Sequence, residues 1–325
     1  MDYQKIKILL DKVKLSAPKV LVLGDIMLDC YINGSVRRIS PEAPVPILNF
    51  EKEKYILGGV GNVAHNLVNL GAEVKLATII GNDSEGEIIQ GLIKKLKMPL
   101  DYVYSSTNIN TTKKTRFISK STQLLRLDND SRGFESSDHF YLQNKLDDML
   151  SEIDCVIISD YDKGVCSEPL IKSVILKSNN KKIPIFIDPK GEKWSKYTNS
   201  TCLTPNKKEA EAELKIKLKN DLDYEKASKL ILNKYRLDSC LITRGSEGMT
   251  YNSNTEIIHQ KVEKKEVFDV SGAGDSVIAS MAVSFSTGLT IKQSLELSSI
   301  VSSEVVRFVG TVPFSMKIIN DKNEQ

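Results

Sequence analysis

Short runs of apolar, often β-branched residues recur along the chain, separated by stretches with helical periodicity. Several runs are almost entirely apolar, which is typical of strands that helices cover on both faces. The alternation of such strands with helices predicts an α/β fold built on a doubly wound, mostly parallel sheet sandwiched by helices. The strand-like runs are 20–23, 74–80, 155–159, 185–187, 201–204 and 240–243.

Helical spacing is clearest in two early segments. Residues 62–70 place their apolar side chains on one face of a helix. Residues 84–97 do the same, and Ser84 followed by Glu87 matches the capping-box pattern that starts many helices. We therefore expect the second of these helices to begin with Ser84 as its cap.

Two regions lack this alternation of strand and helix. Segments 30–57 and 113–128 contain strand-like pieces without intervening helices, and their polar and apolar residues partly alternate. Such alternation is typical of a sheet with one face in water. We expect a small β-sheet lid attached to a single domain that spans residues 1–325.

Composition narrows the class of protein. The formal charge is +3, from 45 basic and 42 acidic residues, and the lysine pairs are scattered, so no nucleic-acid partner is expected. The five cysteines form no C-x-x-C pair, which argues against a disulfide framework or a zinc site. The start of the chain lacks a signal-like apolar run, and no stretch approaches the roughly 20 apolar residues of a membrane helix. A cytoplasmic protein is expected.

The segment with the most chemical content is DVSGAGD at 269–275, which precedes an apolar helix at 277–285. Small residues at a helix start let backbone N–H groups approach a phosphate, and the helix dipole favours negative charge there. A carboxylate one step inside the helix, here Asp275, can accept a proton from a hydroxyl that attacks the phosphate. Taken alone, the pattern also fits a glycine-rich turn before a helix.

A second glycine-rich helix entry, GGVGN at 58–62, lies early in the chain. Its glycines permit close approach to a ligand, and Asn62 offers both a donor and an acceptor. Many loops look like this one, so the segment is a weak signal by itself. The presence of one such entry early and another late in the chain is the informative feature.

Four ordered motifs together resemble the ribokinase-type (PfkB) carbohydrate kinases. Segments 58–62 and 269–275 match the two family signatures, 206–209 (NKKE) resembles the N-x-x-E motif, and 243–248 (TRGSEG) resembles the T-x-G-x-x-G of the nucleotide site. The resemblance covers roughly residues 19–313. It implies a ribokinase-like fold and an ATP-dependent sugar kinase.

The resemblance also implies roles for the matching residues. Asp275 would be the catalytic base, and the backbone amides of Gly272, Ala273 and Gly274 would form an anion hole. Glu209 would help to hold Mg²⁺. The residues implied at the ATP site are Lys190, Asn206, Thr243, Gly245 and Gly248. A monovalent cation such as K⁺ would lie near Asp269 and Gly310.

Further stretches resemble the heptose-phosphate kinase branch of the family. They are 24–29, 38–46, 159–164, 188–191 and 203–206. That branch phosphorylates the anomeric hydroxyl of D-glycero-β-D-manno-heptose 7-phosphate, on the route to ADP-heptose for lipopolysaccharide. The resemblance implies substrate contacts from Asp25, Asp29, Arg38, Gly58, Gly59, Asn62, Arg116, Arg126 and Lys163.

The sequence supports some of these predicted substrate contacts more strongly than others. A phosphorylated sugar needs cations, which arginine and lysine supply through charge-assisted hydrogen bonds. Taken singly, each such cation is more often a solvated surface residue. Asp29 is expected at the end of the first strand, where the family holds sugar hydroxyls. Asp25 fits simple strand-end polarity as well as it fits a ligand role.

Alternatives remain at this stage. Another ribokinase-type kinase, acting on an unphosphorylated sugar or a nucleoside, would share the general motifs, and a non-catalytic sugar-binding protein could keep the fold. Many members of the heptose branch are fused to a nucleotidyltransferase with an H-x-G-H motif, which this sequence lacks. We therefore expect a stand-alone kinase or the kinase half of such a fusion. The resemblance also implies a homodimer formed through the small sheet.

Overall fold

The computed structural model describes residues 3–120, 122–262, 267–308 and 310–315. Its main element is a nine-stranded sheet with the order β13-β12-β11-β10-β9-β8-β1-β4-β5. Neighbours from β11 through to β5 are parallel, and β12 and β13 extend one edge in antiparallel fashion. The strands are β1 (Lys19–Gly24), β4 (Glu73–Gly81), β5 (Val103–Ser106), β8 (Cys155–Ser159), β9 (Ile185–Asp188), β10 (Cys202–Leu203), β11 (Ser239–Thr243), β12 (Met249–Ser253) and β13 (Ile257–Gln260).

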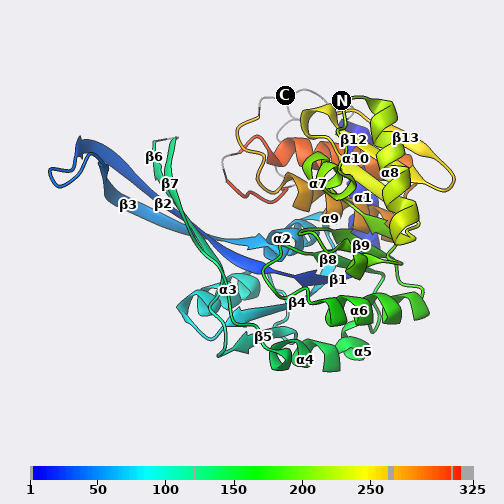
Figure 1. Ribbon diagram of the computed structural model, residues 1–325, viewed down its shortest axis with the longest axis horizontal. Coiled ribbons are helices and arrows are strands. Elements are labelled where there is room, and N and C mark those ends of the chain that lie inside the picture. Colours follow the sequence, from blue (N-terminus) through cyan, green and yellow to red (C-terminus); the bar gives the residue numbers. More distant parts are fainter. Residues whose placement is uncertain (1–2, 121, 263–266, 309, 316–325) are drawn as a thin grey trace.

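Helices cover the two faces of this sheet (Figure 1). Side chains alternate along β1, so that Val20 and Val22 pack into one core while Leu21 and Leu23 pack into the other. The first core contains α1 (Tyr3–Ser16), α2 (Val60–Leu70), α3 (Ser84–Lys95), α9 (Ala273–Ser286) and α10 (Ile291–Val305). The second contains α4 (Ser136–Asn144), α5 (Leu146–Met149), α6 (Glu168–Asn180), α7 (Lys207–Leu214), α8 (Asp221–Tyr235) and the 3₁₀ turn η1 (Trp194–Tyr197). A second 3₁₀ turn is η2 (Gly245–Glu247). The predicted three-layer α/β fold is confirmed.

The predicted small sheet is present and projects from the main body as a long ribbon (Figure 1). Its strand order is β3-β2-β6-β7. Strand β2 pairs antiparallel with β3 and parallel with β6, and β7 closes the outer edge. The strands are β2 (Ile26–Ile39), β3 (Pro46–Gly59), β6 (Lys113–Ser119) and β7 (Thr122–Asn129). Strands β2 and β3 therefore reach closer to the main sheet than segment 30–57 suggests.

The capping-box prediction for Ser84 and Glu87 is wrong by one residue. The N-cap of α3 is Asp83, whose backbone is extended and whose side chain accepts from the Gly86 N–H at 2.8 Å. The same carboxylate also accepts from the Thr111 N–H at 2.7 Å. Because Asp83 joins the helix start to a neighbouring loop, it outcompetes Ser84 for the cap position.

Two expectations from composition can be compared with the structure. All five cysteines are buried and free, and none forms a disulfide bond in the structure. Among the residues that the structure describes, no helix is both long enough and apolar enough to span a bilayer.

Candidate active site

The two glycine-rich helix entries meet in space. Gly272 is the N-cap of α9, with a left-handed φ of 80°, and a Cβ at this position would lie 2.7 Å from Nδ2 of Asn62. Asn62 lies in the first turn of α2 and donates from Nδ2 to Oδ2 of Asp275 at 2.7 Å. The glycine thus allows the carboxamide from the early motif to reach the carboxylate of the late one.

Asp275 lies in a buried pocket where each carboxylate oxygen has a donor. Asn62 holds Oδ2, and the Tyr161 hydroxyl donates to Oδ1 at 2.8 Å. Burial raises the pKa of Asp275, and these two hydrogen bonds act in the opposite direction. Tyr161 was not predicted as a site residue, although it is the second residue after β8, at the sheet edge where ligands bind in open α/β folds.

A second group of charges gathers beyond the end of β9. Lys190 forms an ion pair with Glu209, and Asp188 ends the strand. The pKa of Asp188 is raised to about 8. Burial is the largest cause; the positive charge of Lys190 lowers the pKa, and the negative charges of Glu209 and Asp275 raise it. The carboxylates of Asp188, Glu209 and Asp275 therefore all interact with the single ammonium group of Lys190. Such an oxygen-rich, negatively charged corner fits a hard cation such as Mg²⁺, with Glu209 as its protein-side contact.

We expect Asp188→Asn to stabilise the protein in alkaline buffer. The folded state holds the Asp188 proton up to about pH 8, whereas the ordinary value is 3.8. Between these values folding stability falls as pH rises, because the unfolded chain releases this proton while the folded state keeps it bound. The variant avoids this loss, so its Tm should exceed that of the wild type by roughly 4 °C at alkaline pH and match it in acid. Thermal melts across this range measure the difference.

The control for this experiment is Asp147→Asn. Asp147 is exposed, and its hydrogen bond to Lys177 lowers the pKa of its carboxyl, so its replacement should give no gain of stability at alkaline pH. A wild-type Tm that stays level between about pH 5 and 8 would contradict the proposed burial cost at Asp188.

The N-x-x-E motif also has a local structural role. Asn206 is the N-cap of α7, and its Oδ1 accepts from the Glu209 N–H at 3.0 Å. In return, Glu209 accepts from the Asn206 N–H through Oε2 at 2.7 Å. This reciprocal capping box fixes both side chains and leaves Oε1 of Glu209 directed at Lys190.

A cavity of about 980 Å³ adjoins the amino end of α9. Its size and mixed polar and apolar lining suit a nucleotide. The lining joins the η2 turn to the helix start, through Gly245, Glu247, Val267, Val270, Ala273 and Val306 among others.

Thr243 and Gly248 flank this cavity without lining it. Thr243 ends β11 and forms a bridge with Asn206. Gly248 has a φ of 99°, and a Cβ there would lie 2.0 Å from the Gln260 carbonyl oxygen. Both residues therefore shape the turn that presents Gly245, and their contact with the nucleotide stays a prediction.

The sequence predicted that Asp29 ends the first strand, and the structure shows that it does not. Strand β1 ends at Gly24, and Asp29 is the fourth residue of β2. Its Oδ1 accepts from Arg116 at 2.7 Å and its Oδ2 from the Thr311 hydroxyl at 3.1 Å. A Cβ on Gly58 would lie 2.7 Å from Oδ2, so the glycine leaves space beside the carboxylate. Gly59 has a left-handed φ of 59°.

Asp25 has a structural role at the end of β1. Its side chain is 1% exposed and accepts three backbone N–H groups, from Tyr161 at 2.8 Å, Lys163 at 3.2 Å and Val165 at 2.9 Å. Asp25 therefore anchors the loop that follows β8, and its contact with a sugar stays a prediction.

The predicted phosphate-binding cations are only partly brought together. Arg126 lies opposite Arg116 in the β6–β7 register, so the two side chains share one face of the small sheet, and Arg126 pairs with Asp128. Lys163 pairs with Asp130 at 2.8 Å. Arg38 is nine residues along β2 from Asp29, a span of about 30 Å. The structure therefore places Arg38 outside the site of its own chain.

A buried carboxylate at a glycine-rich helix start, beside a nucleotide-sized cavity, defines a phosphotransferase site. The chain belongs to the pfkB family of carbohydrate kinases, whose family description matches residues 17–317. It is therefore a sugar kinase, as the motifs predict.

Relatives and solved structures agree with this assignment. The bifunctional protein HldE of Helicobacter hepaticus is 40% identical over 296 residues, which cover 91% of this chain and 61% of the relative. HldE of Trichlorobacter lovleyi is 38% identical over 96% of this chain and 63% of its own length. The chain thus spans a little over three-fifths of these relatives.

Solved structures confirm the fold. Phosphofructokinase-2 from Escherichia coli, in complex with potassium, matches with a TM-score of 0.80 at 19% identity, covering 94% of this chain and 97% of that one. Ribokinase from Arabidopsis thaliana, complexed with ribose and ATP, matches with a TM-score of 0.72 at 19% identity, covering 94% and 98%.

Proposed function

We propose that this kinase transfers the γ-phosphoryl group of ATP to the C1 hydroxyl of D-glycero-β-D-manno-heptose 7-phosphate, giving the 1,7-bisphosphate. The observation that carries the proposal is the convergence of Asp275, Asn62 and the Gly272 turn beside the nucleotide-sized cavity. The substrate is supported by the sequence stretches typical of the heptose branch and by similarity to proteins named HldE.

In the proposed reaction the C1 oxygen forms a bond to the γ-phosphorus, and the bond from that phosphorus to the β–γ bridging oxygen breaks. Asp275 takes the proton of the C1 hydroxyl. The amides of Gly272, Ala273 and Gly274 face the charge that develops on the transferred group, an arrangement worth about 3 kcal/mol for each donor. Catalysis is then mainly positioning and electrostatics.

Lys190 and Glu209 would organise the phosphates of ATP, together with Asn206, which caps the same helix turn. Mg²⁺ held near Glu209 would neutralise phosphate charge. A monovalent cation such as K⁺ is proposed near Asp269, whose carboxylate accepts from the N–H groups of Ser271 and Gly310 at 2.9 Å each.

The sugar would lie against the base of the small sheet, between Asp29 and Asp275. Its 7-phosphate would meet Arg126 and Lys163, whose ion pairs with Asp128 and Asp130 are partly exposed and can exchange for a phosphate. The expected product is the substrate of an adenylyl transfer that leads to ADP-heptose. Because ATP and sugar phosphates are cytoplasmic metabolites, we place the enzyme in the cytoplasm.

ADP release with Mg-ATP tests this proposal. The acceptors to compare are the β and α anomers of the heptose 7-phosphate, fructose 6-phosphate and ribose. Turnover confined to the β anomer supports the proposal. Turnover on fructose 6-phosphate or ribose keeps the kinase and replaces the substrate, and no turnover on any acceptor favours a non-catalytic sugar-binding protein.

We also propose a homodimer formed through the small sheet. Strand β7 is exposed along its whole length, and large apolar side chains of this sheet face solvent. An exposed edge strand with apolar neighbours is typical of a surface that another chain covers. The exposed side chains are Ile39, Val45, Phe50, Leu124, Leu125 and Leu127.

Light scattering coupled to size exclusion should therefore give about twice the chain mass of 36.3 kDa. Replacing Leu125 and Leu127, which are about 60% exposed, by Ser should shift the mass toward that of one chain without unfolding the protein. A wild-type protein that elutes as a single monomer at micromolar concentration would rule out this dimer.

A further inference from the structure

The geometry points to Tyr161 as the residue that positions the carboxylate of Asp275 for proton transfer. This inference rests on the proposed function, because it assigns a partner to the proposed base. Its direct support is the hydrogen bond of 2.8 Å from the Tyr161 hydroxyl to Oδ1 of Asp275. Together with Asn62 on the other oxygen, it leaves the carboxylate one orientation in its pocket.

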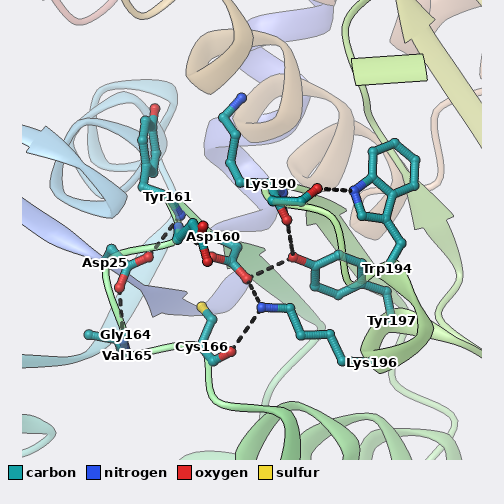
Figure 2. A network of polar contacts seen from close by, with 12 residues as sticks. Asp25, Asp160, Tyr161, Gly164, Val165, Cys166, Lys190, Trp194, Lys196 and Tyr197 are labelled. Atoms are coloured by element: carbon teal, nitrogen blue, oxygen red, sulfur yellow. Dashed lines mark hydrogen bonds and ion pairs between the residues drawn. The ribbon is translucent and has the colours of Figure 1, made fainter. Parts of the chain in front are cut away.

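The backbone of Tyr161 is fixed from two sides. The Tyr161 N–H donates to Asp25, which follows β1. The preceding residue, Asp160, is held through its side chain. Asp160 pairs with Lys196 at 2.5 Å and accepts from the Tyr197 hydroxyl at 2.7 Å. Figure 2 shows these groups, which tie Asp160 to η1 and Tyr161 to Asp25, the residue that follows β1.

The Tyr161 side chain extends away from this buried network. In Figure 2 its ring and the Lys190 side chain rise on the same side, and the Lys190 ammonium lies 5.8 Å from the ring centre. Tyr161 therefore lies close both to the proposed base and to the cation proposed to meet ATP. A rigid loop that presents a hydroxyl at this point fits a positioning role better than a role in packing.

The hydrogen bond also has an electrostatic consequence. A donor to a carboxylate favours its charged form, so Tyr161 keeps the pKa of Asp275 lower than burial alone would. The charged groups that face Asp275 are Lys190 after β9, Asp29 on β2 and Asp188 at the end of β9. Of these, only Lys190 acts in the same direction as Tyr161. Loss of the Tyr161 hydroxyl should therefore produce a measurable rise in the pKa of Asp275.

The test is Tyr161→Phe, which removes only the hydroxyl. A hydrogen bond to a charged group is typically worth enough to raise the pKa of Asp275 by about one unit. The carboxyl signal of Asp275, assigned with Asp275→Asn and followed by carbon-13 NMR, should show this rise. In ADP-release assays kcat should fall about 10-fold to 100-fold, with KM for ATP within about twofold of wild type.

The matched control is Tyr141→Phe. Tyr141 also donates its hydroxyl to an oxygen, the Asp101 carbonyl at 3.2 Å, and stacks on Tyr104. It packs against the second core, on the face of the sheet opposite α9, which carries the proposed base. Its loss should change neither the pKa of Asp275 nor kcat.

The outcomes separate this inference from the proposed function. An unchanged pKa of Asp275 in Tyr161→Phe overturns the inference, even if kcat falls, because the loss is then structural. A raised pKa with unchanged kcat overturns it too. If the wild type phosphorylates a different sugar, kcat is measured with that sugar. If it phosphorylates none, the proposed function fails, and with it the role of Tyr161 in proton transfer.

Discussion

Asp275→Asn should bind ATP normally and lose turnover by about 10³-fold. An asparagine keeps the shape of the side chain but cannot accept the proton of the acceptor hydroxyl, and general-base catalysis is typically worth 10² to 10⁴ in rate. Folding should not suffer, because burial already raises the pKa of Asp275 and so disfavours its charged form. The measurements are kcat from ADP release, the Kd for ATP by calorimetry, and Tm.

Measured together, kcat, Kd and Tm distinguish a missing base from a damaged helix start. A variant that loses ATP binding together with turnover would indicate a damaged α9 start. Turnover within a few-fold of wild type would show that another group takes the proton. Asp275 is 3% exposed and is held by hydrogen bonds from Asn62 and Tyr161. It is also the one acidic residue in the first turn of α9.

Gly272→Ala should lower kcat on the order of 100-fold and cost about 1–2 kcal/mol of stability. The positive φ of 80° is strained for any residue with a Cβ. The added Cβ would also lie 2.7 Å from Nδ2 of Asn62 and push it from Asp275. The strained turn would also move the backbone amide of residue 272 out of place, and loss of one well-placed donor in an anion hole typically reduces kcat by 10² to 10³. ADP-release kinetics and a denaturant melt measure the two effects.

Gly288→Ala provides the matched control. Gly288 also has a positive φ, of 67°, but a Cβ there meets nothing within 4 Å. It should show the loss of stability without the loss of turnover. If both variants lose stability equally and both keep their activity, the close approach of Gly272 to Asn62 has no catalytic importance.

The central strands could be predicted from the sequence, whereas the edge strands could not. The six predicted runs form the middle of the sheet, where both faces are buried and apolar residues are continuous. Strands β5, β12 and β13 were missed. They are short and mix polar with apolar residues, as in β13, whose side chains are exposed or half-buried. A local pattern cannot distinguish such a strand from a loop.

Candidate site residues that belong to motifs could be proposed from the sequence, whereas those recognised only by long-range contacts could not. Asn62 and Asp275 are 213 residues apart, and their contact follows only from the fold. Tyr161 and Asp188 matched no general motif. Tyr161 contacts Asp275 at the start of α9, and Asp188 lies near Glu209 at the start of α7, so both are recognised only through contacts that the fold creates. For Asp25 the sequence left two interpretations open, strand-end polarity and a ligand role. The structure adds three backbone N–H partners, which a local pattern cannot reveal.

Because β2 is long, a small rotation of the small sheet at its base moves its outer end much farther than its base. The strand begins directly after Asp25 and continues through 14 residues to Ile39, with a register shift at Asn33 and Gly34. At about 3.3 Å per residue it is roughly 45 Å long, so a tilt of about 10° at its root moves the tip by about 8 Å and Asp29 by only about 2 Å. A large movement of the outer sheet would therefore displace Asp29, the carboxylate proposed to face the sugar, by only a small distance. A displacement at the tip of the sheet would thus change the position of Asp29 without disordering the site.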